Sequence, residues 1–448
     1  VWLVLLVKEM TNVSLPTALP VLVTAFDGPV STALPAIATI FYSCGKLVVA
    51  LVTQQIGARK VLLAAYMVAI TGSLLCATAQ SYNRLLVGWC LTQFGCAHVW
   101  VACYGLAVAW VDRCYLGRVL AIVFATGSDG GGILGSVVFS FILRAGWHHV
   151  FLLVGSLGLG VFLLIAGCLH ASAQQAGFSP PDQSDAPPVP SDGAAASSSA
   201  VGSKAAAAVA QSHPLDAAPL SVAVRRFARN GRFWLALGTS CGFTLTFMTM
   251  QSYAALYAAR RLGTAPSVSA RVVSAAMAGS LSGGMLGGLA VDGLRGCALM
   301  TLSATYKLCA LLLGVAWLWA DVALAHGWRP SPAVSPEAMA TALGLILFAL
   351  FGSINYSWAA VLGRCAAKIG GPKHAATAMG IYDVCGFVLR VPFAYAFGLM
   401  LDAPERISSA LALWLAVLTA AHAGAMLLIA AEERDVEVAA AARLRAMI

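Results

Sequence analysis

Ionisable side chains stand inside several long apolar stretches of this chain, where their burial is costly. A charged side chain at the centre of a bilayer costs about 2.5–3.5 kcal/mol on insertion scales, so such groups face a cavity or a partner. Their usual chemistry there is to bind a charged solute, to relay a proton or to form an ion pair. The groups concerned are Lys8, Glu9, Lys46, His98, Asp129, Lys307, Asp383 and Arg390.

Three of these cations, Lys8, Lys46 and Arg390, are candidate binding groups for an anionic solute. For Lys8 the alternative is that it pairs with Glu9 or extends its ammonium group to the membrane surface. For Arg390 the alternative is a partner such as Asp129 or a backbone carbonyl. His98 is interpreted as a hydrogen-bonded packing residue rather than a proton carrier.

Polar and aromatic side chains within the same stretches are candidates for lining a cavity. Tyr42 and Asn355 are the ones we assign to solute binding, although packing is the common role of such residues in membrane helices. The other candidates are Trp100, Tyr104, Tyr356 and Trp358.

No pattern of catalytic or cofactor-binding residues stands out. The sequence contains no G-x-x-x-x-G-K-[ST] motif for nucleotide phosphates, no C-x-x-C and no Cys/His spacing typical of metal sites. Most of its 12 cysteines lie in apolar runs, where cysteine behaves as a small hydrophobic residue. We therefore expect no metal, no cofactor and no enzymatic activity.

Composition places the chain in a lipid bilayer. Of its 448 residues 60% are hydrophobic and only 10% charged, with a mean hydropathy of +0.84. A soluble domain has about 25% charged residues. The net charge of +9 is concentrated in loops on one side, which indicates membrane orientation rather than nucleic-acid binding.

Runs of about 20 apolar residues are long enough to cross a hydrocarbon core. Six precede a polar, Pro/Ser/Ala-rich segment and six follow it. We expect an all-α membrane protein with twelve transmembrane helices in two six-helix bundles. The expected spans are 1–24, 31–55, 61–79, 84–111, 119–143, 150–170, 232–258, 267–291, 298–320, 338–362, 376–401 and 409–430.

The domain boundaries follow from this count. Residues 1–170 form the N-terminal bundle, 171–231 a disordered linker, 232–430 the C-terminal bundle, and 431–448 a tail with a short amphipathic helix at the membrane surface. Basic residues favour the linker side by about two to one, so the linker and both ends are expected to be cytoplasmic. Because the chain opens on Val1 within an apolar run, we expect residues to precede it.

The six-linker-six plan resembles the major facilitator superfamily. That family has a loop of the type G-x-x-x-D-R-x-G-R-K after its second helix, and residues 50–60 here keep the final Gly, Arg and Lys. The equivalent loop of the second half retains Asp292 and Arg295. The resemblance implies that this pair latches one gated state, and the alternative is a simple tight turn.

Shorter motifs are similar to those of the organophosphate:phosphate antiporters, which exchange glycerol 3-phosphate and sugar phosphates for phosphate. These motifs are residues 41–46 (FYSCGK), 110–113 (WVDR), 130–133 (GGGI), 146–151 (GWHHVF) and 375–387 (AATAMG followed by GF). Lys8 lies eight residues before Pro16, as the family's helix-one Arg lies before its Pro. The chain departs from the family at residues 244–246, which lack the helix-seven Arg, and at Gly127, which replaces a His.

In the superfamily's fold the second and eleventh helices are neighbours across the two halves. Lys46 and Asp383 lie at similar depths in those helices, given a rise of about 1.5 Å per residue. The resemblance therefore predicts an ion pair between them that forms in one state and breaks in the other. The alternative is that each residue is satisfied separately. We also expect Asp129 to contribute to ion pairing in the gate.

We conclude from the sequence that the chain is a secondary transporter of a small, anionic, organophosphate-like solute. It would work by alternating access, as a monomer, with the solute and the bilayer as its partners. The intramembrane cations outnumber the acids, which favours an anion. Two alternatives stay open: a transporter-like sensor or scaffold that binds a solute without flux, and a carrier of a non-phosphate substrate.

Overall fold

The computed structural model describes residues 1–111, 122–123, 125–178, 219–294, 297–328, 334–357 and 361–447, some of them by their backbone alone. All regular secondary structure in these residues is helical, because lipid requires each spanning segment to satisfy its own backbone hydrogen bonds. The expected all-α fold class is confirmed. The helices of the first half are α1 (Trp2–Ala25), α2 (Ala33–Ile56), α3 (Ala58–Ala77), α4 (Tyr82–Trp110), α6 (Ala125–Ile142) and α7 (Trp147–Cys168).

The second half has the same plan. Its helices are α10 (Gly231–Leu262), α11 (Pro266–Gly293), α12 (Cys297–Ala325), α13 (Pro336–Ser357), α14 (Gly363–Asp402) and α15 (Ile407–Met447). Nine of the described helices are long and apolar enough to span a membrane by length and composition. The helices α1, α2 and α6 complete the expected twelve, and α1 is made less apolar by its own charged residues.

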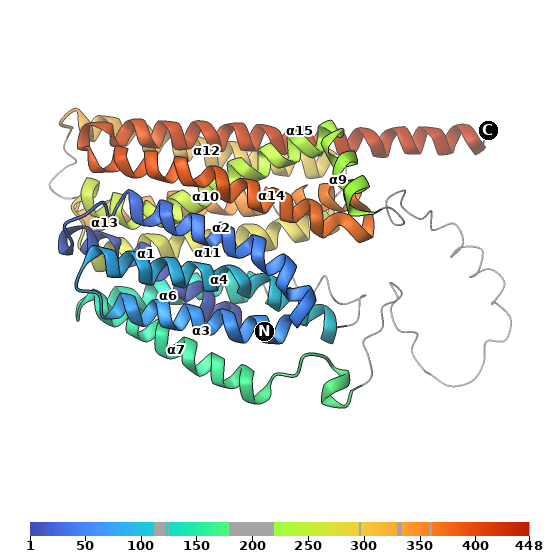
Figure 1. Cartoon of the computed structure of the whole chain (residues 1–448). Helices are drawn as coiled ribbons and strands as arrows, with labels where there is room; N and C mark the ends of the chain where they lie inside the picture. The colour runs from blue at the N-terminus through green and yellow to red at the C-terminus, as the bar shows by residue number, and fades with distance from the viewer. Residues whose placement is uncertain are drawn as a thin grey trace, which may run out of the picture.

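The two halves lie side by side with their helices roughly parallel (Figure 1). Within the first half α3 packs on α4 and α7, and α1 packs on α6. Within the second, α11 packs on α13, and α10 on α14 and α15. Four helix pairs join the halves: α1 with α10, α1 with α11, α2 with α14, and α6 with α11. The charged residues of α1, α2, α6 and α14 are therefore on the helices that meet at this interface.

Two helices extend beyond the predicted membrane spans. The apolar part of α14, Thr377–Asp402, agrees with the predicted span 376–401, but the helix begins earlier, at Gly363. The helix α15 continues through the tail to Met447 as one helix. The tail is rich in Ala, Glu and Arg, which are strong helix formers, so no residue ends the helix at the membrane boundary. In Figure 1 it extends beyond the bundle.

Part of the segment predicted as disordered is also helical. A short turn, η2 (Gln174–Ala176), follows α7, and α9 (Leu220–Ala228) precedes α10. The helix α9 buries Ala223 and Phe227 and contacts α14, while its Arg225 and Arg226 stay exposed. Packing of this apolar face explains why the helix forms. Residues 179–218 lie outside the described part of the chain.

Small residues allow α11 and α13 to approach closely. A methyl group built on Gly279 would overlap the carbonyl of Phe348, and one on Gly283 would overlap the carbonyl of Gly352. Missing side chains let membrane helices pack backbone against backbone. Gly279 and Gly283 are therefore packing residues at this contact.

This contact predicts that Gly283→Ala destabilises the protein by about 1–3 kcal/mol, the usual cost of overpacking. The matched control is Gly288→Ala on the same helix, where an added methyl group meets nothing within 4 Å. Thermal unfolding in detergent measures both. Equal unfolding temperatures for the two variants would contradict the close approach.

Candidate functional site

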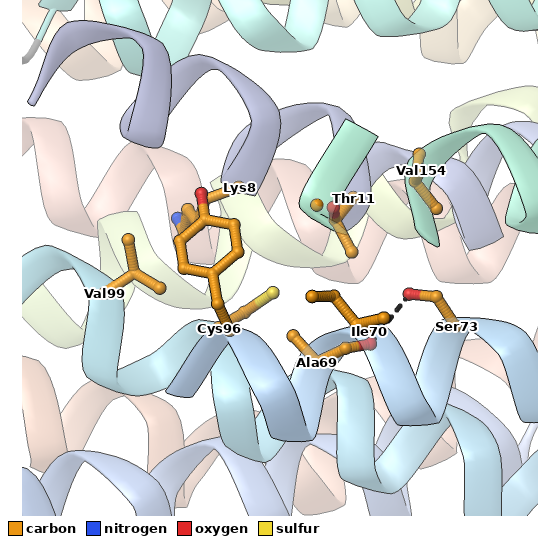
Figure 2. A pocket seen from close by; sticks show the side chains of 10 residues that line it. Lys8, Thr11, Ala69, Ile70, Ser73, Cys96, Val99 and Val154 are labelled. Carbon is orange, nitrogen blue, oxygen red and sulfur yellow. Dashed lines mark hydrogen bonds between the residues drawn. The ribbon is translucent and has the colours of Figure 1, made fainter. Parts of the chain in front are cut away.

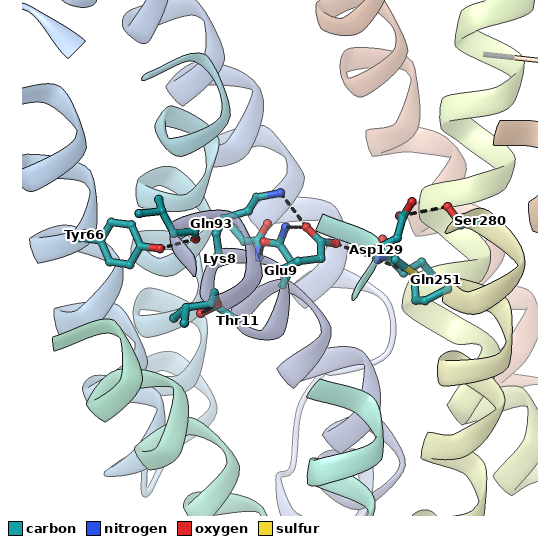
Figure 3. Close-up of polar contacts among 12 residues, drawn as sticks. Lys8, Glu9, Thr11, Tyr66, Gln93, Asp129, Gln251 and Ser280 are labelled. Atoms are coloured by element: carbon teal, nitrogen blue, oxygen red, sulfur yellow. Dashed lines mark hydrogen bonds and ion pairs between the residues drawn. The ribbon is translucent and has the colours of Figure 1, made fainter. Parts of the chain in front are cut away.

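Glu9 connects the two halves near the middle of the bundle (Figure 3). Its carboxylate accepts hydrogen bonds from Lys8 Nζ at 2.7 Å and Asn12 Nδ2 at 3.0 Å, both on α1, and from Gln251 Nε2 on α10 at 3.2 Å. Lys8 and Glu9 are each only 6% exposed. The structure thus has the Lys8–Glu9 ion pair that was the alternative to Lys8 as a free cation. Gln251 was not among the residues predicted from the sequence.

Lys46 on α2 contacts the carboxylate of Asp383 on α14, across the two halves. The Lys46 ammonium also lies over the ring of Phe387, 4.4 Å from its centroid, and 5.3 Å from the centroid of Tyr42. Aromatic faces attract a cation, so the lysine is held from three sides. The side chain of Asp383 remains 33% exposed, which leaves it accessible to water or solute.

Arg390 is two turns further along α14. Its Nη2 donates to Ser252 Oγ at 2.7 Å and to the carbonyl of Met248 at 3.2 Å, both on α10. Its Nε is buried and has no hydrogen-bond partner. No carboxylate among the described residues forms an ion pair with Arg390, and the Asp129 carboxylate accepts a hydrogen bond from Ser280 instead.

Tyr42 lies among three of the cations. The Lys46 ammonium is 5.3 Å from the centroid of its ring, and Lys8 and Arg390 are within electrostatic range of its hydroxyl group. Its ring also packs against that of Phe387, with 4.8 Å between centroids. Two helices of the first half and one of the second therefore bring positive charge to one tyrosine.

Asp129 on α6 faces the second half. Ser280 Oγ on α11 donates to its Oδ1 at 3.1 Å, and Asn355 on α13 contacts the same serine hydroxyl. Asn355 Nδ2 also lies 3.2 Å from the Ser280 carbonyl. Asn355, which was expected to bind solute, is thus hydrogen-bonded in this structure to Ser280, the residue that contacts Asp129.

A cavity of about 10 Å³ lies beside Lys8 (Figure 2). Thr11, Tyr66, Ser73 and Cys96 are among the residues that line it, so it is within the first half rather than between the halves. Its volume is that of one water molecule. This cavity beside Lys8 is therefore too small for a solute.

Other candidates lie away from this interface. Lys307 on α12 is 2% exposed within the second half, 5.3 Å from the ring centroid of Tyr356, and its Nζ has no hydrogen-bond partner. Tyr356 is itself buried against Ser303. His98 Nδ1 lies 2.7 Å from the Phe94 carbonyl of its own helix, which agrees with a packing role. The side chain of Asp292, and Arg295 and Trp358, lie outside the described part of the chain.

A second contact between the halves closes the end of the bundle away from α9 and the C-terminus. Ser31, in the loop between α1 and α2, donates to the Asp402 carboxylate at 2.6 Å, and Arg260 pairs with the same carboxylate. The Tyr253 hydroxyl lies 2.8 Å from the Ser31 carbonyl. These residues were missed because they flank the apolar runs rather than interrupt them.

The Lys46–Asp383 ion pair thus joins two bundles of apolar helices. Residues 1–394 match the model of the Major Facilitator Superfamily, and the chain belongs to this superfamily of secondary transporters. Curated protein sequences give no match. The closer resemblance to the organophosphate:phosphate antiporters stays a prediction.

Solved transporters share the fold. A bacterial homolog of the human lysosomal transporter Spinster, inward-facing and unoccupied, superposes with a TM-score of 0.66 at 14% identity, over 96% of this chain and 95% of that chain. A D-xylose–proton symporter gives 0.64 at 13% identity, over 95% of each chain. A POT family transporter in complex with 5-aminolevulinic acid gives 0.64 at 12%, over 96% and 94%.

The Lys46–Asp383 contact predicts the outcome of charge reversal. Lys46→Asp or Asp383→Lys alone should lower uptake into proteoliposomes at least about tenfold, because two like charges would then face each other at a partly buried site. The double reversal should restore uptake. Arg144→Asp, at an exposed residue between α6 and α7, is the control. A double variant as inactive as the single ones would exclude the pair as a gate.

Proposed function

We propose that this protein is a secondary transporter that carries a small anionic organic solute between two bundles by alternating access. The observation that supports an anion most directly is Arg390, a cation at the interface with no carboxylate partner among the described residues. The solute would bind near Tyr42, where Lys8 and Lys46 also act.

The charge balance around Tyr42 supports this site. Three cations, Lys8, Lys46 and Arg390, face two carboxylates, Glu9 and Asp383, and each lysine contacts one of them. One positive charge is left over, on a guanidinium. Its planar fork of donors suits the two oxygens of a carboxylate or a phosphate. A singly charged anionic group would neutralise it.

The chemistry of the anion follows from the number of cations that are free. A phosphate dianion favours two or more cationic donors, and here both lysines are already paired with carboxylates. A carboxylate or a singly charged phosphate group suits Arg390 better. An organophosphate, as the resemblance implies, remains within this class if one of the lysines exchanges its carboxylate for the phosphate.

Alternating access needs contacts that form and break. The polar contacts between the described parts of the halves run from the middle, at Lys46–Asp383 and Glu9–Gln251, to the Ser31–Asp402 end. We propose that residues 1–170 and 232–430 rock against each other about these contacts, as a monomer. The linker, both chain ends and the Asp292–Arg295 latch would be on the cytoplasmic side.

Uptake into phosphate-loaded proteoliposomes, with a panel of phosphate esters and carboxylates, tests the proposal. Saturable uptake of at least one anion is the expected result, and exchange for internal phosphate would support the organophosphate assignment. Uptake of carboxylates alone would favour the non-phosphate carrier. Binding of an anion without any flux would overturn transport in favour of the sensor or scaffold.

Arg390→Gln should raise the half-saturating concentration of the anion about 10- to 100-fold, which corresponds to the loss of a charge-assisted hydrogen bond. Lys307→Met is the matched control, because it removes a buried cation that lies within the second half and away from Tyr42. Concentration-dependent uptake measures both variants. An unchanged half-saturation in Arg390→Gln would exclude the guanidinium as the anion's binding group.

A further inference from the structure

Asp129 is the one carboxylate at the interface that no cation neutralises in the described residues. The Lys8–Glu9, Lys46–Asp383 and Arg260–Asp402 pairs account for the other three carboxylates. The nearest polar partner of Asp129 is the neutral hydroxyl of Ser280 at 3.1 Å. Asp129 is half-buried, so its ionised form is partly shielded from water, and a proton is the simplest group that removes its charge when water is excluded.

The surroundings of Asp129 contain few other charges. The helix α1 contributes Glu9 and Lys8, which act on Asp129 with opposite sign and are paired with each other. The only charged residues of α11, Arg271 and Asp292, lie more than two turns from Ser280 along the helix. The helix α7 has no Asp, Glu, Lys or Arg, and the only one in α13 is Glu337, at the end of that helix far from Asn355. No other charged residue on the helices packed around Asp129 could therefore neutralise it in place of a proton.

Loss or gain of a proton at this place would act on the contact between the halves. Asn355 on α13, Ser280 on α11 and Asp129 on α6 form a continuous polar chain that crosses from the second half to the first. Figure 3 shows its contact between Ser280 and Asp129. A hydrogen bond to an ionised acceptor is roughly twice as strong as one to a neutral acceptor. Protonation therefore weakens the link between α6 and α11, and deprotonation strengthens it.

We propose that Asp129 takes up one proton for each singly charged anion bound at Arg390, so that the protein is an electroneutral anion–proton symporter. This inference rests on the proposed transport function. When Asp129 is ionised and no solute is bound, the Arg390 guanidinium and the Asp129 carboxylate are each without a partner of opposite charge in the described residues. Anion binding removes the first and protonation removes the second, so the loaded interface can move with all of its charges matched. The step is proton binding to the carboxylate, with no other bond made or broken.

The proton site can be tested without a solute. Infrared spectra of the protein in nanodiscs, recorded as the pH is raised, should show a carboxylic-acid band that disappears in the wild type and is missing in Asp129→Asn. Ser280→Ala removes the donor to the ionised form, so the band should persist to higher pH. The same band in Asp129→Asn as in the wild type would overturn the assignment.

Flux of radiolabelled inorganic phosphate at mildly acidic pH, where the singly charged form predominates, tests the coupling. In the wild type a pH gradient should drive accumulation and a potassium–valinomycin potential should not. In Asp129→Asn, accumulation of phosphate driven by the pH gradient should fall at least tenfold, while exchange of external for internal phosphate should persist. Phosphate uptake by this variant should also respond to the membrane potential. Wild-type accumulation in this variant would overturn the coupling.

The two experiments separate this inference from the function on which it rests. An Asp129 band that titrates, with no flux of phosphate or of any panel anion, would support the proton site but overturn transport and with it the symport. Anion flux in a protein whose Asp129 does not titrate would support transport and overturn the proton site.

Discussion

The cost of a bare charge in lipid is the constraint on which this structure depends. A transporter needs charges to recognise its solute, and the bilayer tolerates them only where a partner is at hand. Here the partners come from the opposite half or from the adjacent residue. Lys46 meets Asp383 across the interface, and Glu9 shares its carboxylate between Lys8 and Gln251. The interface between the two halves, which moves during transport, is also where the buried charges find their partners.

The remaining architecture serves to bring these matches together. Glycine contacts between α11 and α13 let the backbones touch, so that Ser280 and Asn355 reach Asp129 as one chain. Aromatic rings at Tyr42 and Phe387 flank Lys46 where hydrogen-bond acceptors are few. At the far end of the bundle, the Asp402 carboxylate accepts a hydrogen bond from Ser31 and forms an ion pair with Arg260. In each case a polar or charged side chain is stabilised by a residue from another part of the sequence.

The fold was predictable because lipid imposes it locally: a run of apolar residues long enough to span must be a helix, and the polar segment after α7 separates two sets of six. The neighbours of Lys46 could be inferred only through the resemblance to a known fold. Gln251 could not, because an uncharged amide does not interrupt an apolar run. Helix ends such as that of α15 were missed because the tail's composition favours helix on both sides of the membrane boundary.

The central claim is that the two halves move against each other about the charged interface. Distances between spin labels measured across the halves at both ends test it most directly. One pair would replace Lys60 and Lys368, the other Asp27 and Glu405, all of which are exposed. On addition of the transported anion at acidic pH, the account predicts that one distance lengthens while the other shortens. Distances that both stay fixed, or that change in the same direction, would contradict it.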